Sequence, residues 1–332
     1  METGPERASL RLPPEARALS MDQCRGFAIV MMLLGNFMGH FAFMPSLLTH
    51  HRTGMTLAET IAPLFIFLSG MSYRGSFLRR AGAAGPGAAR GWAVRRHLLI
   101  FAVGVPVYWG HTWDALTHIG LAGILLLPVI HRGVAARLAA VVVFAAVHQA
   151  LFLGTGYGDW VMTSPVCLNG GPLAALTWGM VMLLGTVAWD MRAARPGARL
   201  MADFQLCGWG LVLLGLLFSL PWGDFKPAWP FTRYGMTFPH PLFTGGVAFL
   251  TYDLFYWFCD YRGGRAPLLS PLGRNPLVTY AVLGACVGLS RLVTGAFGDP
   301  SAATAMTAYA AMVAVAYAVA RTLDQRGLLV RL

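Results

Sequence analysis

The sequence contains few charged residues. Lys, Arg, Asp and Glu together make up 12% of its 332 residues, whereas hydrophobic residues make up 56%. The mean hydropathy is +0.58. Soluble domains carry roughly 25% charged residues. The scarcity of charge therefore excludes a soluble globular protein and indicates an integral membrane protein.

Cysteine, internal repeats and an N-terminal apolar run are also scarce or missing. The five cysteines are scattered, and no two of them have C-x-x-C spacing. This pattern argues against a disulfide framework and against a zinc site, so we interpret the cysteines as packing residues and expect no metal. The first 20 residues are polar, so we expect no cleavable signal peptide. The lack of a visible repeat argues against transporters that are built from repeated halves.

The apolar residues fall in long, continuous runs. A membrane span needs about 20 mainly apolar residues, and its backbone must form hydrogen bonds internally. Continuous runs favour helices over the alternating strands of a barrel. We predict an all-α integral membrane protein, a bundle of about ten transmembrane helices. The predicted spans are residues 24–43, 57–76, 96–110, 115–130, 135–153, 172–190, 204–221, 240–260, 275–295 and 302–321.

The spans form one predicted transmembrane domain, residues 22–322. It lies between a polar N-terminal segment, residues 1–21, and a short tail, residues 323–332. The glycine- and alanine-rich stretch 79–91 is predicted to be a flexible cytoplasmic loop, and the polar stretch 154–171 an external one.

The net charge of +11 could indicate a nucleic-acid partner, but its placement argues against one. Most arginines fall in alternate connections between the spans and in the two terminal segments. Basic residues mark the cytoplasmic side, so both termini are expected to be cytoplasmic and the lipid bilayer is the expected partner. The arginine- and alanine-rich, lysine-poor composition suggests the plasma membrane of a high-GC bacterium.

Several polar side chains lie within or beside the predicted spans. Such residues are costly in lipid, so they face the protein interior or a cavity. Asn36 and His40 are four residues apart and share one helix face. We expect four further polar residues to bind substrate in a cavity that opens externally: Glu59, Asp114, His118 and Asp253. Structural roles stay open, because an amide can join helices, His40 can reach interfacial water and Asp114 can cap a helix.

Two stretches resemble the start of the heparan-α-glucosaminide N-acetyltransferase family of transmembrane acyltransferases. The first, RALSMDQCRGFAIVMMLLGNF, is similar to the family pattern R-x-x-S-x-D-x-x-R-G followed by an apolar run and an asparagine. It matches at Arg17, Ser20, Asp22, Arg25, Gly26 and Asn36. The second, residues 50–72, is similar at Gly54, Thr56, Ala58, Pro63, Phe65, Phe67 and Gly70. Residues 239–261 and 268–280 resemble later family segments more loosely, the latter through a G-[RK]-N word with Arg274 and Asn275.

The second stretch departs from the family pattern at three positions. Arg52 replaces the family tryptophan, and Glu59 replaces its aspartate. The family histidine usually stands five residues before the glycine, where this chain has Thr49. His50 or His51 would take that role through a short shift in register, and His40 is a third contender.

The resemblance implies that the protein moves an acetyl group from cytoplasmic acetyl-CoA to an amine or hydroxyl acceptor at the far side of the membrane. The acceptor would be a sugar or a small metabolite. His50, with His51 close behind, would be the base or nucleophile, and Asn36 would donate to the thioester carbonyl or hold the histidine. Direct transfer in a ternary complex and an acyl-histidine relay both stay open.

The resemblance also implies a site for the donor at the cytoplasmic ends of the helices. Arginine forks suit the phosphates of CoA, and polar neighbours orient them. The residues expected to bind the donor are Arg25, Asp22, Ser20, Arg96, Arg274 and Asn275.

Two other functions fit the same pattern of polar residues. A small-molecule transporter or permease could use the cavity, and an inactive relative could only bind a ligand. A transporter would move substrate without acetyl-CoA, whereas an inactive relative would have a blocked tunnel. The identity of the acceptor and self-association into a homodimer stay open.

Overall fold

The protein is helical throughout the part of the chain that the structure describes. The computed structural model describes residues 18–51, 53–108, 110–167, 169–220, 229, 231–298 and 300–328, and contains no strand in them. The predicted all-α class is confirmed. The elements are α1 (Leu19–Phe37), η1 (Met38–His40), η2 (Ser46–Leu48), α2 (Leu57–Val107), α3 (Ala115–Leu125), α4 (Val134–Gly154), α5 (Tyr157–Thr163), α6 (Ala174–Ala194), α7 (Ala198–Ser219), α8 (Pro239–Phe255), η3 (Tyr256–Tyr261), α9 (Leu269–Arg274), α10 (Pro276–Phe297) and α11 (Ala302–Gln325).

The longest helix, α2, is broken at Gly85. This residue has φ 85° and ψ 163°, a left-handed φ that favours glycine, and Pro86 then begins a second helical half. The rings of Tyr73 and His97, one from each half, lie 4.4 Å apart, so the two halves fold back on each other. The prediction of a flexible loop over residues 79–91 is therefore wrong, because this alanine-rich stretch is helical on both sides of the break.

Seven helices in the described residues are long and apolar enough to cross a membrane. Each of the predicted spans falls mainly on a helix, but the predicted number of spans is not reproduced. Two of them share α2, and α3 has only 11 residues. The first falls on α1, which carries Asp22 and Arg25 near its start. The predicted external loop 154–171 contains the short helix α5.

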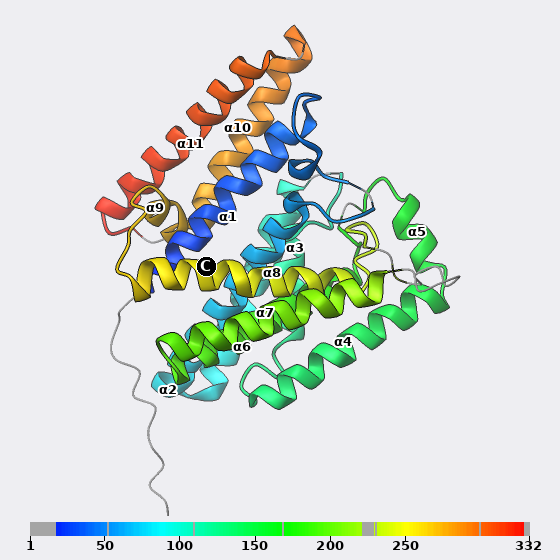
Figure 1. Cartoon of the computed structure of the whole chain (residues 1–332), viewed down its shortest axis with the longest axis vertical. Helices are drawn as coiled ribbons and strands as arrows, with labels where there is room; N and C mark the ends of the chain where they lie inside the picture. The colour runs from blue at the N-terminus through cyan, green and yellow to red at the C-terminus, as the bar shows by residue number, and fades with distance from the viewer. Residues whose placement is uncertain are drawn as a thin grey trace, which may run out of the picture.

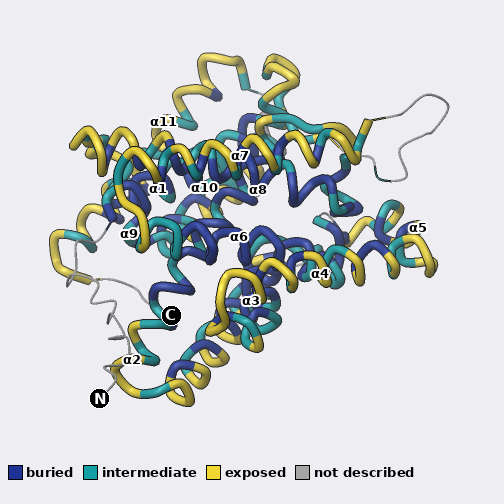
Figure 2. Tube along the Cα trace, turned by 60° about the horizontal axis from the view of Figure 1, so that its bottom comes forward, coloured by how far each residue is buried: buried dark blue, intermediate teal, exposed yellow. Residues whose placement is uncertain are grey.

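Central and peripheral helices differ in burial. In the apolar window, 67% of α2 and 78% of α6 are buried inside the protein, against 11% of α10 and 17% of α11. Helices α7 and α8 pack along each other, and α10 packs on α11 (Figure 1). Exposed residues concentrate on the outer surfaces of these helices (Figure 2). Large apolar residues there, such as Leu206 and Leu292, are suited to contact with lipid.

Glycines allow α2 and α6 to pack with their main chains in contact. A Cβ atom at Gly70 would lie 2.0 Å from the Met182 carbonyl oxygen, and one at Gly185 would lie 2.0 Å from that of Phe67. Small residues at such interfaces are typical of membrane helices. This close packing anchors the first half of α2, which begins at the candidate site.

Candidate functional site

His50 and Glu59 form a hydrogen-bonded pair at the start of α2. His50 Nδ1 donates to Glu59 Oε2 over 3.1 Å. The Glu59 side chain is fully buried, whereas that of His50 is 26% exposed. Because the carboxylate accepts at Nδ1, a neutral His50 carries its lone pair on Nε2. That nitrogen faces α1, since a Cβ atom at Gly35 would lie 3.3 Å from it.

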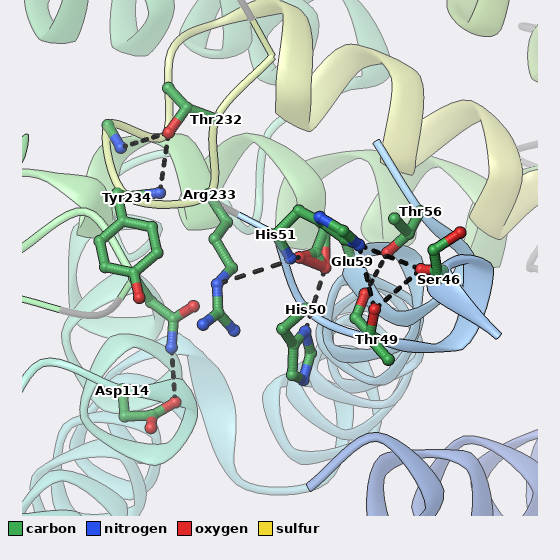
Figure 3. Close-up of polar contacts among 12 residues, drawn as sticks. Ser46, Thr49, His50, His51, Thr56, Glu59, Asp114, Thr232, Arg233 and Tyr234 are labelled. Atoms are coloured by element: carbon green, nitrogen blue, oxygen red, sulfur yellow. Dashed lines mark hydrogen bonds and ion pairs between the residues drawn. The ribbon is translucent and has the colours of Figure 1, made fainter. Parts of the chain in front are cut away.

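Arg233, which sequence reasoning missed as a site residue, also faces Glu59. Its Nε lies 4.0 Å from Glu59 Oε1, and Figure 3 shows the side chain reaching towards the carboxylate. The Gly54 N–H donates to the Phe231 carbonyl over 2.9 Å, which joins the segment that carries Arg233 to the loop before α2. The arginine compensates the buried carboxylate. No short motif links two residues so far apart in the chain.

His51 contributes to the pair through its main chain. The His51 N–H donates to Glu59 Oε1 over 2.9 Å. Its ring lies by Ser46 and Thr49 instead, with Nε2 3.1 Å from the Ser46 carbonyl and 3.0 Å from Thr49 Oγ1. The geometry therefore distinguishes the two candidate histidines: the His50 ring is held by a carboxylate, and the His51 ring is held by the loop.

Asp114 and His118 are held by bonds to their own surroundings. Asp114 caps α3 by accepting from the Ala115 N–H over 2.7 Å, and it also accepts from Asn169 Nδ2 over 2.8 Å. Burial raises the pKa of Asp114, and the bond from Ala115 acts in the opposite direction. His118 is buried, and its Nε2 donates to the Gly171 carbonyl over 2.9 Å. Figure 3 shows Asp114 apart from the His50–Glu59 pair.

Asp253 lies at the opposite end of the bundle from His50. Its Oδ2 accepts from Gln205 Nε2 over 2.6 Å. The neighbouring Tyr252 hydroxyl lies 3.1 Å from Ser20 Oγ, at the start of α1, whereas His50 lies against the end of that helix. The structure therefore does not bring Asp253 together with Glu59, although both were predicted to bind substrate.

Residues predicted to bind the donor gather at the start of α1. Arg25 Nη1 and Arg274 Nε lie 3.2 Å and 3.7 Å from the two carboxylate oxygens of Asp22. The main chains of α1 and α9 touch here, since a Cβ atom at Gly273 would lie 1.8 Å from the Asp22 carbonyl oxygen. Residues 17–37 and 268–280, two stretches singled out in the sequence and far apart in the chain, therefore form one contact, which we call the α1–α9 contact.

Ser20 and Asn275 border the α1–α9 contact. Ser20 Oγ donates to Asp260 Oδ2 over 2.6 Å, and Arg192 Nη2 donates to the same oxygen over 3.1 Å. Asn275 is fully buried between α9 and α10, where its carbonyl accepts from the Thr279 N–H over 3.0 Å. Both residues hold helix ends in place.

Arg96 extends the positive charge near the start of α1. It lies within electrostatic reach of Arg25 and Arg80. The guanidinium carbons of Arg80 and Arg96 lie 4.0 Å and 5.6 Å from the ring centroid of Trp92. Several like charges at one end of the bundle create a positive field that attracts polyphosphate anions.

Asn36 and His40 line a groove between α1 and α10. The groove has a volume of about 350 Å³, and Arg291 lies on its α10 side. Arg291 Nη2 donates to His40 Nε2 over 3.1 Å. Within the described residues no hydrogen bond joins Asn36 to His50, although Gly35, the residue before Asn36, faces the His50 ring.

A buried ion cluster that joins α2, α4 and α6 was also missed from the sequence. Arg74 Nε and Nη2 donate to the two oxygens of Asp190 over 3.0 Å and 3.1 Å. Arg137, which is fully buried, donates to the same carboxylate and to Thr186 Oγ1. The sequence places these two basic residues and one acidic residue at the ends of three predicted spans. A carboxylate that both arginines share would compensate their buried charges, so this pattern could have predicted the cluster.

Comparison with known families identifies the chain. The family model described as heparan-alpha-glucosaminide N-acetyltransferase, catalytic, matches residues 17–215. These residues contain Arg25, His50 and Glu59, whereas Arg233 and Arg274 lie beyond them. Comparison with curated proteins finds no match. The family match confirms the resemblance predicted from residues 17–37 and 50–72.

Proposed function

We infer that the chain, which belongs to the heparan-alpha-glucosaminide N-acetyltransferase catalytic family, is a membrane acetyltransferase. From this membership we propose that it moves an acetyl group from cytoplasmic acetyl-CoA to an amine or hydroxyl acceptor, a sugar or a small metabolite, at the far side of the membrane. The observation that carries the proposal is the His50–Glu59 pair, a buried carboxylate that orients a partly exposed imidazole.

In the direct route, His50 is the general base. Its Nε2 takes a proton from the acceptor while the acceptor nitrogen or oxygen attacks the carbonyl carbon of the thioester. The bond from that carbon to sulfur then breaks, and the His50 imidazolium returns a proton to the leaving thiolate. Glu59 keeps Nδ1 as the donor and stabilises the imidazolium.

In the relay route, His50 is a nucleophile. Nε2 attacks the thioester carbonyl, the bond from the carbonyl carbon to sulfur breaks, CoA leaves as the thiolate, and the acetyl group is held on Nε2 of a positively charged ring. The acceptor then attacks this acetyl group, which restores the neutral imidazole, and the acceptor's proton passes through solvent to the thiolate. The same hydrogen bond to Glu59 serves both routes, because each passes through a positively charged ring.

Asn36 and His51 support this chemistry. Asn36 matches the asparagine of the family pattern, and its carboxamide is proposed to stabilise the oxyanion that forms on the thioester carbonyl. His51 fixes Glu59 through its main-chain N–H, and its ring is the second candidate for the base. Glu59, Asp114 and His118 remain the proposed substrate-binding residues, with Glu59 the one that touches His50. Asp253, which was also predicted to bind substrate, lies at the other end of the bundle and is not part of this site.

The donor is proposed to bind at the start of α1. Arg25, Arg96 and Arg274 would bind its phosphates. Asp22 would orient Arg25, and Asp324, which accepts from Arg274 Nη1 over 2.7 Å, would orient Arg274. Ser20 and Asn275 hold the surrounding helix ends. Helix α1 rises about 16 Å between Arg25 and Asn36, at 1.5 Å per residue. The acetyl end of an extended donor would therefore run along α1 towards His50.

The finer topology is also a proposal. We propose about ten crossings. Helices α1 and α3 count as one crossing each, and the two halves of α2 count as two. Both termini are proposed to be cytoplasmic. The alternation of arginine-rich connections supports this arrangement. We also propose that residues 22–322 form one transmembrane domain and that the protein lies in a bacterial plasma membrane.

Transfer of labelled acetyl from acetyl-CoA, measured with the full chain in nanodiscs and a panel of amines and sugars, tests the proposed function. His50→Ala should lower kcat by about 100-fold or more, the usual scale for a general base. His51→Ala should lower it much less. His131→Ala is the matched control, because this exposed histidine lies outside the site. Activity retained in a variant that lacks the His50, His51 and Asn36 side chains together would overturn the assignment.

Two further measurements separate the remaining alternatives. Protein incubated with labelled acetyl-CoA in the absence of acceptor and then quenched should carry label in the relay route only, and His50→Ala should remove that label. Flux of the acceptor across sealed vesicles without acetyl-CoA would instead support a transporter.

A further inference from the structure

The groove between α1 and α10 has the features of a binding site. It has a volume of about 350 Å³ and exposes polar groups of Asn36, His40, Ser290, Arg291 and Thr294. Pockets that bind small molecules combine apolar walls with a few convergent polar groups. None of these side chains takes part in the His50–Glu59 pair.

The groove presents a cation to its opening. Arg291 donates to His40 Nε2 over 3.1 Å, which requires that nitrogen to be unprotonated, so the contact leaves the positive charge of Arg291 uncompensated. In the part of the chain that the structure describes, no carboxylate pairs with Arg291. A guanidinium group has five N–H donors, so it can bind an anion while it keeps the bond to His40.

The other polar groups of the groove add hydrogen-bonding capacity. Ser290 Oγ donates to the Val287 carbonyl over 2.8 Å, and Thr294 Oγ1 donates to the Arg291 carbonyl over 3.2 Å. Each hydroxyl oxygen therefore presents its lone pairs to a ligand. The Asn36 carboxamide, which forms no side-chain hydrogen bond among the described residues, offers both donors and an acceptor. Together with Arg291, these hydroxyl and amide groups suit a ligand that has hydroxyl or amine groups beside an anion.

An aromatic wall closes one side of the groove. Phe41 lies edge-on to Phe37 at a centroid distance of 5.5 Å and is stacked on Phe43 at 5.4 Å. Phe37 and Phe41 both line the groove. Aromatic faces pack well against the apolar surface of a ring-shaped ligand.

The groove lies close to the proposed catalytic base. Gly35 faces His50 Nε2 from the C-terminal end of α1, and the groove lies at the same end of this helix. His40, which lines the groove, is within electrostatic reach of His50. His50 itself does not line the groove, so a bound ligand would have to extend past the end of α1 to bring a nucleophilic group to Nε2.

The groove also borders the outer surface of α10. Leu289, Leu292 and Val293, which flank Arg291 in the sequence, are 65%, 74% and 51% exposed. Apolar residues with this exposure on a membrane helix contact lipid. An anionic ligand could therefore enter either from water or as the headgroup of a lipid.

We propose that this groove is the acceptor subsite and that Arg291 selects acceptors that carry an anionic group, a phosphate or a carboxylate, beside the amine or hydroxyl that is acetylated. The proposal rests on the proposed acetyltransferase function. In it, Arg291 binds the anion, the aromatic wall covers the apolar face of the acceptor, and the nucleophile points towards His50. His40 is a positioning residue that orients Arg291.

Matched pairs of probes test the proposal with the full chain in nanodiscs. Glucosamine 6-phosphate and glucosamine form the soluble pair. Phosphatidylethanolamine in phosphatidylcholine nanodiscs, compared with phosphatidylcholine alone, is the lipid arm. A charge-assisted contact contributes about 1.5–3 kcal/mol, so the phosphate should raise kcat/KM by roughly 10- to 100-fold within the soluble pair. Both lipids carry a phosphate, and only phosphatidylethanolamine has an amine that can be acetylated, so the lipid arm shows whether a lipid headgroup is an acceptor. Binding of each soluble probe without acetyl-CoA, measured by calorimetry, gives a second readout.

The variants separate selectivity from folding and catalysis. Arg291→Gln should remove the preference for the phosphate-bearing probe in both kcat/KM and binding, with an unchanged KM for acetyl-CoA, and Arg291→Lys should restore part of it. Arg321→Gln on α11, an exposed arginine bonded to Tyr317, is the control and should keep the preference. Equal use of both probes by the wild type, or a preference that survives in Arg291→Gln, would overturn the inference. If the wild type turned over no acetyl-CoA with any probe, the result would instead count against the proposed function.

Discussion

Replacing Glu59 with glutamine tests the catalytic pair most directly. The variant keeps the shape of the side chain and can still accept from the His51 N–H, but it removes the negative charge that lies 3.1 Å from the His50 ring. Opposite charges about 4 Å apart attract by about 4 kcal/mol at an effective dielectric constant near 20. We expect the Glu59→Gln variant to lose most of this attraction in the transition state, where the His50 ring is positively charged. The expected decrease in kcat is about 10²–10³-fold, or about 3–4 kcal/mol of barrier.

The assay measures kcat and both KM values for acetyl transfer, together with thermal unfolding of the same preparation. The KM for acetyl-CoA should not change, because Glu59 lies at the opposite end of α1 from the arginines. Asp203→Asn is the matched control, since this surface carboxylate pairs with Arg195 at 3.4 Å and should keep wild-type activity. A folded Glu59→Gln variant whose kcat stays within about threefold of wild type, less than 1 kcal/mol, would refute the role of the pair.

Three further predictions concern packing, buried charge and the donor. Gly273→Ala should lower the unfolding temperature, because its Cβ would lie 1.8 Å from a main-chain oxygen. Gly284→Ala, in the open part of α10, is the control and should not lower it. Equal unfolding temperatures for the two variants would contradict the α1–α9 contact. Asp190→Asn leaves two buried arginines without a carboxylate and should cost about 3–5 kcal/mol in a chemical unfolding experiment, while Asp203→Asn should cost little. Arg25→Ala should raise the KM for acetyl-CoA about tenfold or more, since it removes a charge-assisted phosphate contact. The KM for the acceptor should change less. An unchanged KM for acetyl-CoA would exclude the proposed donor site.

Helices were predictable where local composition decides the structure. Continuous apolar runs located α4, α6, α7, α8, α10 and α11 because a segment in lipid must satisfy its own backbone. The stretch around Gly85 was misread, since alanine favours a helix and a single glycine with a left-handed φ is enough to reverse the chain.

The site was predictable only in part. The resemblance pointed to both His50 and His51, and the two could not be separated because they are adjacent in the chain. The carboxylate of Glu59 separates them in the structure by accepting from the ring of one and the main chain of the other. Arg233 and Arg291 were not among the predicted site residues, since no sequence spacing relates them to Glu59 or to His40.

The sequence by itself determined that this is an all-helical membrane protein of the acetyltransferase family, because hydropathy and the motif words are local properties of the chain. It also placed polar residues at both ends of the first helix. Only the tertiary structure decided which histidine is held by a carboxylate, that Asp22 lies between Arg25 and Arg274, and that Arg291 faces a groove beside Asn36. These contacts join segments that are far apart in the chain, and their geometry depends on how the helices pack.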